Sequence, residues 1–65
     1  MKLKHHIKES SETYVFEENN ELYFYVEKYD ENGWIETREV WHNNNPISLT
    51  PKGQEVIEKV QKLNA

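Results

Sequence analysis

The chain has 65 residues, of which 35% are hydrophobic and 31% are charged, with a formal net charge of −4 at pH 7 and no cysteine. A chain of this length forms one small domain, here residues 1–65, and the missing cysteines exclude disulfides and thiolate metal sites. The acidic balance disfavours binding to the phosphate backbone of nucleic acids. Because no apolar run is long enough to cross a membrane and no signal-peptide pattern opens the chain, we expect a cytoplasmic protein without membrane contact.

Residues 2–8 read Lys-Leu-Lys-His-His-Ile-Lys. In an extended conformation they form an edge strand whose lysines discourage unwanted pairing, with Leu3, His5 and Ile7 on one face. The spacing of Leu3 and Ile7 also fits a helical turn. Whether residues 2–8 form a strand therefore stays open, and the predicted sheet has three strands or four.

The central strand is predicted over Leu22–Tyr29, the longest run of aromatic and β-branched residues in the chain. Side chains alternate between the two faces of a strand. Leu22, Phe24 and Val26 therefore share a purely apolar face, while the tyrosines share the other face. Each tyrosine brings a hydroxyl that needs water or a partner, so we expect the apolar face to be the dry one.

Residues 13–18 also alternate, and they form a hairpin with the central strand. Asn19-Asn20 suits a two-residue turn, because asparagine tolerates the positive φ that such turns require. This turn places Val15 opposite Phe24 on the apolar face and Tyr14 opposite Tyr25 on the tyrosine face. The patterns of the two strands agree, which supports the hairpin.

Asp30–Gly33 is the strongest turn signal, and residues 34–41 form the next strand. The register of this strand is ambiguous by one residue, and a slip of one residue exchanges its faces. A tight Asn32-Gly33 turn places Arg38 opposite Glu27, which favours it over a three-residue loop with Gly33 in a bulge. The tight turn directs Trp34, Arg38 and Val40 to the tyrosine face and Ile35, Thr37 and Trp41 to the apolar face.

Residues 42–46 contain three asparagines and a proline and are predicted to form a loop. Thr50 suits the N-cap of a helix that begins at Pro51 and runs to Leu63. The predicted fold is α+β: an antiparallel three-stranded meander, four-stranded if residues 2–8 join it, with one C-terminal amphipathic helix packed on one face. We expect the apolar stripe Val56, Ile57, Val60 and Leu63 of this helix to cover the sheet face formed by Val15, Leu22, Phe24 and Val26.

Residues Leu49–Val60 resemble the segment that opens the last helix of winged-helix transcription regulators. The upstream helices of that family, including its recognition helix, are missing from this chain. The function of that family is therefore not carried over.

No group of residues has the spacing of a catalytic, cofactor or metal site. The histidines are His5, His6 and His42. Neighbouring residues of a strand point to opposite faces, so His5 and His6 cannot bind one metal together. The acids fall at turns and strand ends, where water solvates them, and the two glycines form no phosphate loop. The sequence therefore predicts a non-enzymatic protein without cofactor or metal.

One helix cannot cover both apolar sheet faces, so an aromatic face is predicted to stay open to a partner. The leading hypothesis is a small protein-interaction or regulatory module that uses this face or a sheet edge. Its partner is an unknown protein or a second copy of the chain. The alternatives are a binder of single-stranded nucleic acid, and an acidic mimic that occupies a basic groove of a nucleic-acid-binding protein. The candidate interaction face consists of Tyr14, Phe16, Tyr23, Tyr25 and Trp34.

Overall fold

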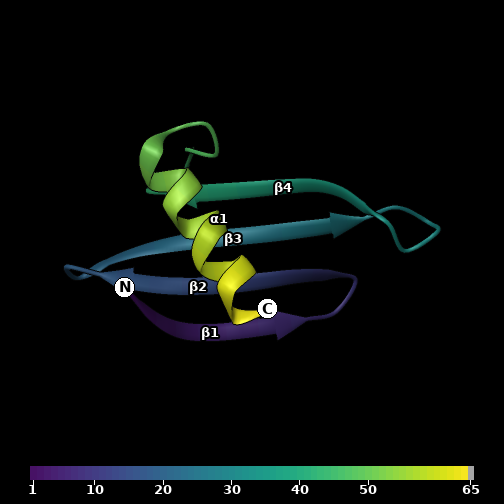
Figure 1. Ribbon diagram of the computed structural model, residues 1–65, viewed down its shortest axis with the longest axis horizontal. Coiled ribbons are helices and arrows are strands. Elements are labelled where there is room, and N and C mark those ends of the chain that lie inside the picture. Colours follow the sequence, from purple (N-terminus) through teal and green to yellow (C-terminus); the bar gives the residue numbers. More distant parts are fainter. Residues whose placement is uncertain (65) are drawn as a thin grey trace.

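The computed structural model describes residues 1–64 and shows an antiparallel β-meander with one C-terminal helix (Figure 1). The strands lie side by side in chain order, and the helix crosses one face of the sheet obliquely. The α+β meander is thus confirmed, with five strands instead of three or four. The elements are β1 (Lys2–Lys8), β2 (Ser11–Glu18), β3 (Glu21–Tyr29), β4 (Ile35–His42), β5 (Asn45–Pro46) and α1 (Pro51–Leu63).

The β2–β3 hairpin has the predicted register. Val15 pairs with Phe24 and Tyr14 with Tyr25. Asn19 and Asn20 form the turn, with φ angles of 53° and 64°. Both angles lie in the left-handed region, which asparagine adopts more readily than most other residues.

Strand β1 is extended and pairs with β2, which answers the question that the sequence left open. Its register shifts between Leu3 and His5, so Leu3 lies opposite Phe16 while His5 lies opposite Val15. The expectation that Leu3 shares a face with His5 is therefore wrong, because an irregular residue between them reverses the alternation. Every residue of β1 is exposed.

The β3–β4 pairing follows the register of the tight turn, with Glu27 opposite Arg38. The turn itself is longer, because the register shifts beyond Lys28 and Tyr29 pairs with Ile35. Ile35 therefore lies on the tyrosine face, and its expected place on the apolar face is wrong. The Asp30 side chain holds this loop closed by accepting hydrogen bonds from the backbone N–H groups of Asn32 and Trp34, at 2.9 and 3.0 Å. An aspartate that bonds its own following backbone in this way offers an alternative to the two-residue turn.

The sequence predicted a loop over residues 42–46, and this prediction is wrong. Asn43 and Asn44 form a second tight turn with φ angles of 50° and 62°, and β5 returns along β4. Pro46 pairs with Trp41 in this short edge strand, a position that tolerates proline. The chemistry is the same as at Asn19-Asn20, and both turns lie at the same end of the sheet.

Helix α1 begins as predicted. The Thr50 hydroxyl accepts a hydrogen bond from the Gly53 N–H at 3.0 Å, and Pro51 occupies the first turn. A side chain at Gly53 would place its Cβ 1.9 Å from the Ile47 carbonyl oxygen. Only glycine therefore allows the first turn of the helix to lie this close to the segment that precedes it.

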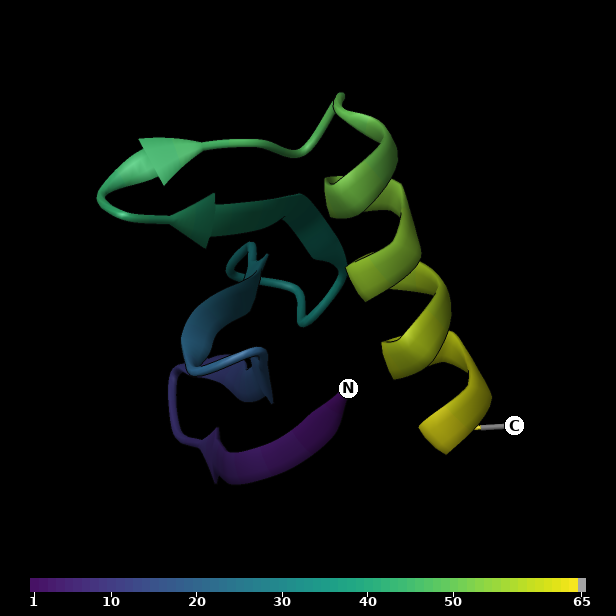
Figure 2. The ribbon, with the colours of Figure 1, turned by 90° about the vertical axis from the view of Figure 1, so that its left-hand side faces the viewer.

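The helix packs on the tyrosine face, not on the Val15–Phe24 face where it was expected. In Figure 2 the helix lies on one side of the curved sheet, and the other side is bare. The four aromatic rings of the tyrosine face give the helix a large area to bury. The buried cluster consists of Tyr14, Phe16, Tyr23, Tyr25, Val40, Val56 and Val60.

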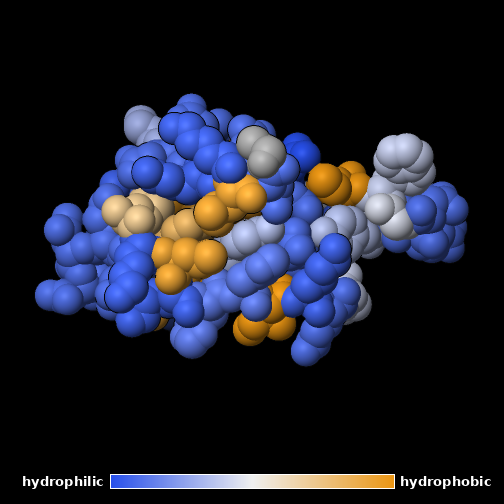
Figure 3. All heavy atoms as spheres, turned by 60° about the horizontal axis from the view of Figure 1, so that its bottom comes forward, coloured by the Kyte–Doolittle hydropathy of each residue, from blue (hydrophilic) through white to orange (hydrophobic). Residues whose placement is uncertain are grey.

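Seen from the β1 edge, hydrophilic atoms dominate the surface, and apolar atoms gather between strand and helix (Figure 3). Leu3 on β1 is 38% exposed and Leu63 near the helix end is 53% exposed. The last helical turn thus covers the sheet less completely than the turns around Val56 and Val60, which are 0% and 2% exposed.

Candidate interaction site on the bare sheet face

The predicted interaction residues are mostly covered by the chain itself. Tyr14, Phe16, Tyr23 and Tyr25 are between 1% and 6% exposed beneath the helix. The tyrosine face is therefore not an open surface, and the candidate interaction face inferred from the sequence is corrected. Trp34, the fifth residue of that set, lies apart from the other four at the β3–β4 loop and is 74% exposed.

Glutamates make this burial possible by satisfying the tyrosine hydroxyls. The Tyr25 and Tyr29 hydroxyls donate to Glu27 at 2.6 and 2.9 Å, and Tyr23 donates to Glu21 at 3.4 Å. A buried hydroxyl without a partner is costly, so these bonds remove the main objection to a dry tyrosine face. The sequence carried this signal, because residues two apart on a strand share a face. The pairs are Glu12/Tyr14, Glu21/Tyr23, Tyr25/Glu27 and Glu27/Tyr29.

These contacts shift the pKa values of the groups involved. Burial raises the pKa of Tyr29 to about 12, and the nearby Glu27 carboxylate adds to this effect. Burial likewise raises the pKa values of Tyr25, Tyr23 and Tyr14 above the ordinary value. Burial opposes the charge of Glu27, but hydrogen bonds from Tyr25 and Tyr29 outweigh it and lower its pKa.

The surface that remains open is the opposite face, which we call the bare sheet face. A row of paired residues crosses all five strands there: Val15 pairs with Phe24, Phe24 with Trp41 and Trp41 with Pro46, and His5 begins the row on β1. Phe24, which belongs to this row, is 40% exposed. Leu22, which lies beside the row on β3, is 43% exposed. The apolar side chains of the bare sheet face are Ile7, Val15, Leu22, Phe24, Val26 and Trp41.

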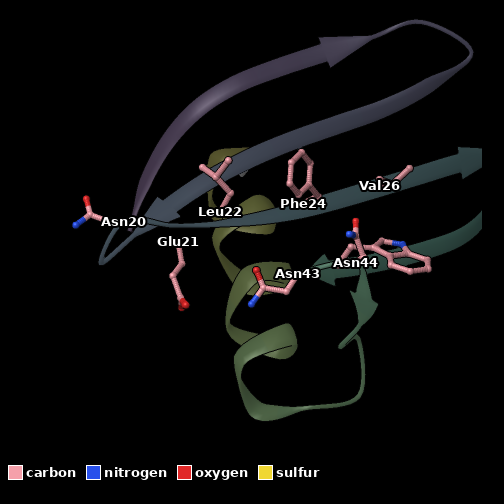
Figure 4. Close-up of a pocket in the computed structure, with 8 residues that line it drawn as sticks. Asn20, Glu21, Leu22, Phe24, Val26, Asn43 and Asn44 are labelled. Carbon is pink, nitrogen blue, oxygen red and sulfur yellow. The ribbon is translucent and has the colours of Figure 1, made fainter.

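An open hollow of about 780 Å³ lies on this face. Leu22, Phe24, Val26 and Trp41 line it, together with Glu21. Figure 4 shows Leu22 and Phe24 standing on the side of the sheet that faces away from the helix. The two asparagine turns border the hollow through the side chains of Asn20, Asn43 and Asn44.

His42 positions one of these turns. Its Nδ1 donates to the Leu22 carbonyl oxygen at 3.0 Å, which leaves Nε2 to accept from the Asn43 amide at 3.2 Å. The ring also stacks on Tyr23, with centroids 4.3 Å apart. One imidazole therefore ties the β4–β5 turn to strand β3 and fixes that side of the hollow.

The charges on the bare sheet face are few and are paired within the face. Lys28 lies 3.7 Å from Glu39, and Lys4 lies 3.8 Å from Glu17. Trp41 donates from Nε1 to Glu39 at 3.1 Å. By contrast, Glu12, Glu18, Glu21 and Glu27 bond groups on the helix side of the sheet. The bare sheet face is thus close to neutral although the chain carries a net charge of −4.

The histidines do not converge on a metal site. His5 lies opposite Val15 and His6 opposite Tyr14, so the two rings occupy opposite faces as predicted. His6 stacks on Tyr14 at 4.1 Å and lies 3.1 Å from Glu12. Within residues 1–64, no three histidine or acidic side chains are grouped so that they could hold a metal ion.

Comparisons with protein-family models, with curated proteins and with solved structures give no match to this chain. Its function is therefore inferred from the geometry alone. Across residues 1–64, no helix combines the length and the apolar character needed to span a membrane.

Proposed function

We propose that this protein is a small protein-interaction module that binds a protein partner through the bare sheet face. The observation that carries the proposal is the half-exposure of Leu22 and Phe24 at the floor of an open hollow. Exposed apolar side chains that lie together, unlike scattered ones, are typical of protein interaction sites. Within residues 1–64 the helix is already used on the other face, and no other element covers this one.

The two alternatives find less support. A single-strand nucleic-acid binder needs open aromatic rings for base stacking, and Tyr23 and Tyr25 are 6% and 1% exposed. An acidic mimic that used the aromatic face would need free carboxylates there, whereas Glu27 is bonded to two tyrosines and Glu18 to Lys52. Neither arrangement favours contact with nucleic acid or with a basic groove.

A sheet edge is also a poorer candidate than the bare sheet face. The exposed edge strand β1 carries Lys2, Lys4 and Lys8. Lysines on an edge strand oppose the addition of a further strand, which is how many natural proteins protect such edges. We therefore place the interaction on the face of the sheet.

Site-specific photo-crosslinking in the cells that make the protein tests this proposal. A photo-reactive side chain replaces Phe24 in one variant and Leu22 in a second. Leu49, which is 95% exposed, is the matched control because it is apolar but lies outside the face. We expect discrete protein adducts from positions 22 and 24 and none from position 49. Folded variants that give no adduct at either face position would overturn the proposal.

A further inference from the structure

We infer that the partner at the bare sheet face is a second copy of this chain, an inference that rests on the proposed function. A two-fold dimer sets the same patch of each copy against the other. Such a patch must therefore be compatible with itself. The bare sheet face meets this requirement in its charge, its polar rim and its size.

The charges of the face do not oppose self-association. Lys28 pairs with Glu39 and Lys4 with Glu17 inside one copy, so neither sign is left in excess at these positions. Two copies with a net charge of −4 each repel one another, but the paired charges of this face add little to that repulsion. Glu12 and Glu27, which bond Tyr14 and Tyr25, point to the helix side and stay away from the contact. Glu21 lines the hollow, where its carboxylate lies 3.5 Å from His42 Nε2.

The rim of the hollow is also self-compatible. Asn20, Asn43 and Asn44 supply amide groups, each with donors and an acceptor. An amide can therefore bond to a copy of itself, which a lysine or a glutamate cannot do. A rim of this kind suits a symmetric contact, whereas a charged partner would be recognised by a rim of opposite charge.

The size of the face is adequate. The molecule measures 37 × 20 × 20 Å along its principal axes, which gives its long face a footprint of roughly 700 Å². Stable complexes bury about 600 to 1,000 Å² on each partner, so a contact over most of this face falls at the lower end of that range. Pairing edge to edge would instead bring the lysines of two β1 strands together, so the face is the favoured contact between copies.

Sedimentation of the purified full chain over a range of concentrations tests this inference. We expect a species of twice 7.9 kDa that dissociates on dilution. Phe24→Asp and Leu22→Asp should each raise the dissociation constant by roughly thirtyfold or more, as for central interface residues. Leu49→Asp, which changes a leucine outside the face that is 95% exposed, should leave it unchanged. Circular dichroism checks that each variant is folded.

The outcomes separate the two proposals. A chain that stays monomeric at about 1 mM, the affinity limit of weak association, overturns the inference. The inference is also overturned if the folded Phe24→Asp and Leu22→Asp variants both dimerise with an unchanged dissociation constant. If a monomeric chain still gives adducts with another protein from position 24, the proposed interaction site stands and only the identity of the partner is wrong. Without adducts and without a dimer, both proposals fail.

Discussion

The two faces of the sheet differ in a way that reverses the simple expectation about burial. On the bare sheet face Leu22 and Phe24 stay 43% and 40% exposed, while on the face with the hydroxyl groups Tyr25 is 1% exposed. The tyrosines offer large rings, and glutamates placed two residues away satisfy their hydroxyls. A tyrosine whose hydroxyl has an acceptor nearby can therefore be as good a core residue as a fully apolar ring such as Phe24.

The largest expected effect contrasts one residue from each face. Tyr25→Ala should lower the free energy of unfolding by about 4 kcal/mol, because it removes a fully buried ring from the core. Phe24→Ala should cost only about 1 kcal/mol, since much of that ring already contacts water. Urea unfolding at low protein concentration measures both, so that association does not contribute. Equal losses at the two positions would contradict the assignment of the faces.

An intermediate effect is expected from pH, and it concerns only the tyrosine face. A tyrosine whose pKa is higher in the folded state stabilises the fold below its unfolded pKa of about 10. This contribution is lost as the pH rises through the folded value, which is about 12 for Tyr29. The urea midpoint should therefore fall between pH 10 and 12. Tyr29→Phe should reduce the fall, whereas Glu36→Gln, an exposed control, should not.

At acid pH Glu27 makes the stability of the fold change with pH in the opposite direction, so that stability falls as the pH falls. Its pKa is lowered in the folded state, so it stabilises the fold above its unfolded pKa of about 4.3. That stability disappears as the pH falls through the folded value. The same titration, extended below pH 5, should show this loss in the wild type and a smaller loss in Glu27→Gln. An unfolding midpoint that does not change with pH at either end would argue against the tyrosine–glutamate network.

The smallest effect is expected at Trp34, which the sequence grouped with the tyrosine face. Its side chain is 74% exposed, so Trp34→Ala should change the free energy of unfolding by no more than about 0.5 kcal/mol. Trp41→Ala, in the row that crosses the bare sheet face, is the matched comparison and should cost more. Thermal unfolding followed by circular dichroism distinguishes the two. A large loss at Trp34 would mean that the loop packs on the sheet.

Local chemistry alone determined much of this protein. The alternation in β2 and β3, the Asn19-Asn20 turn, the Thr50 cap and the register of Arg38 opposite Glu27 were all predicted and are all present. Each of these depends on residues that are close in sequence or on one cross-strand pair. The Asn43-Asn44 turn had the same signal, but three asparagines before a proline were interpreted as a loop.

The tertiary structure decided which face the helix covers, and with it the location of the candidate site. The sequence presents two faces able to receive Val56 and Val60, and alternation within a strand cannot rank them. The ranking depends on the Glu27 and Glu12 acceptors and on the close approach at Gly53, which only the folded chain brings together. Long-range packing therefore chose between two patterns that were locally equivalent.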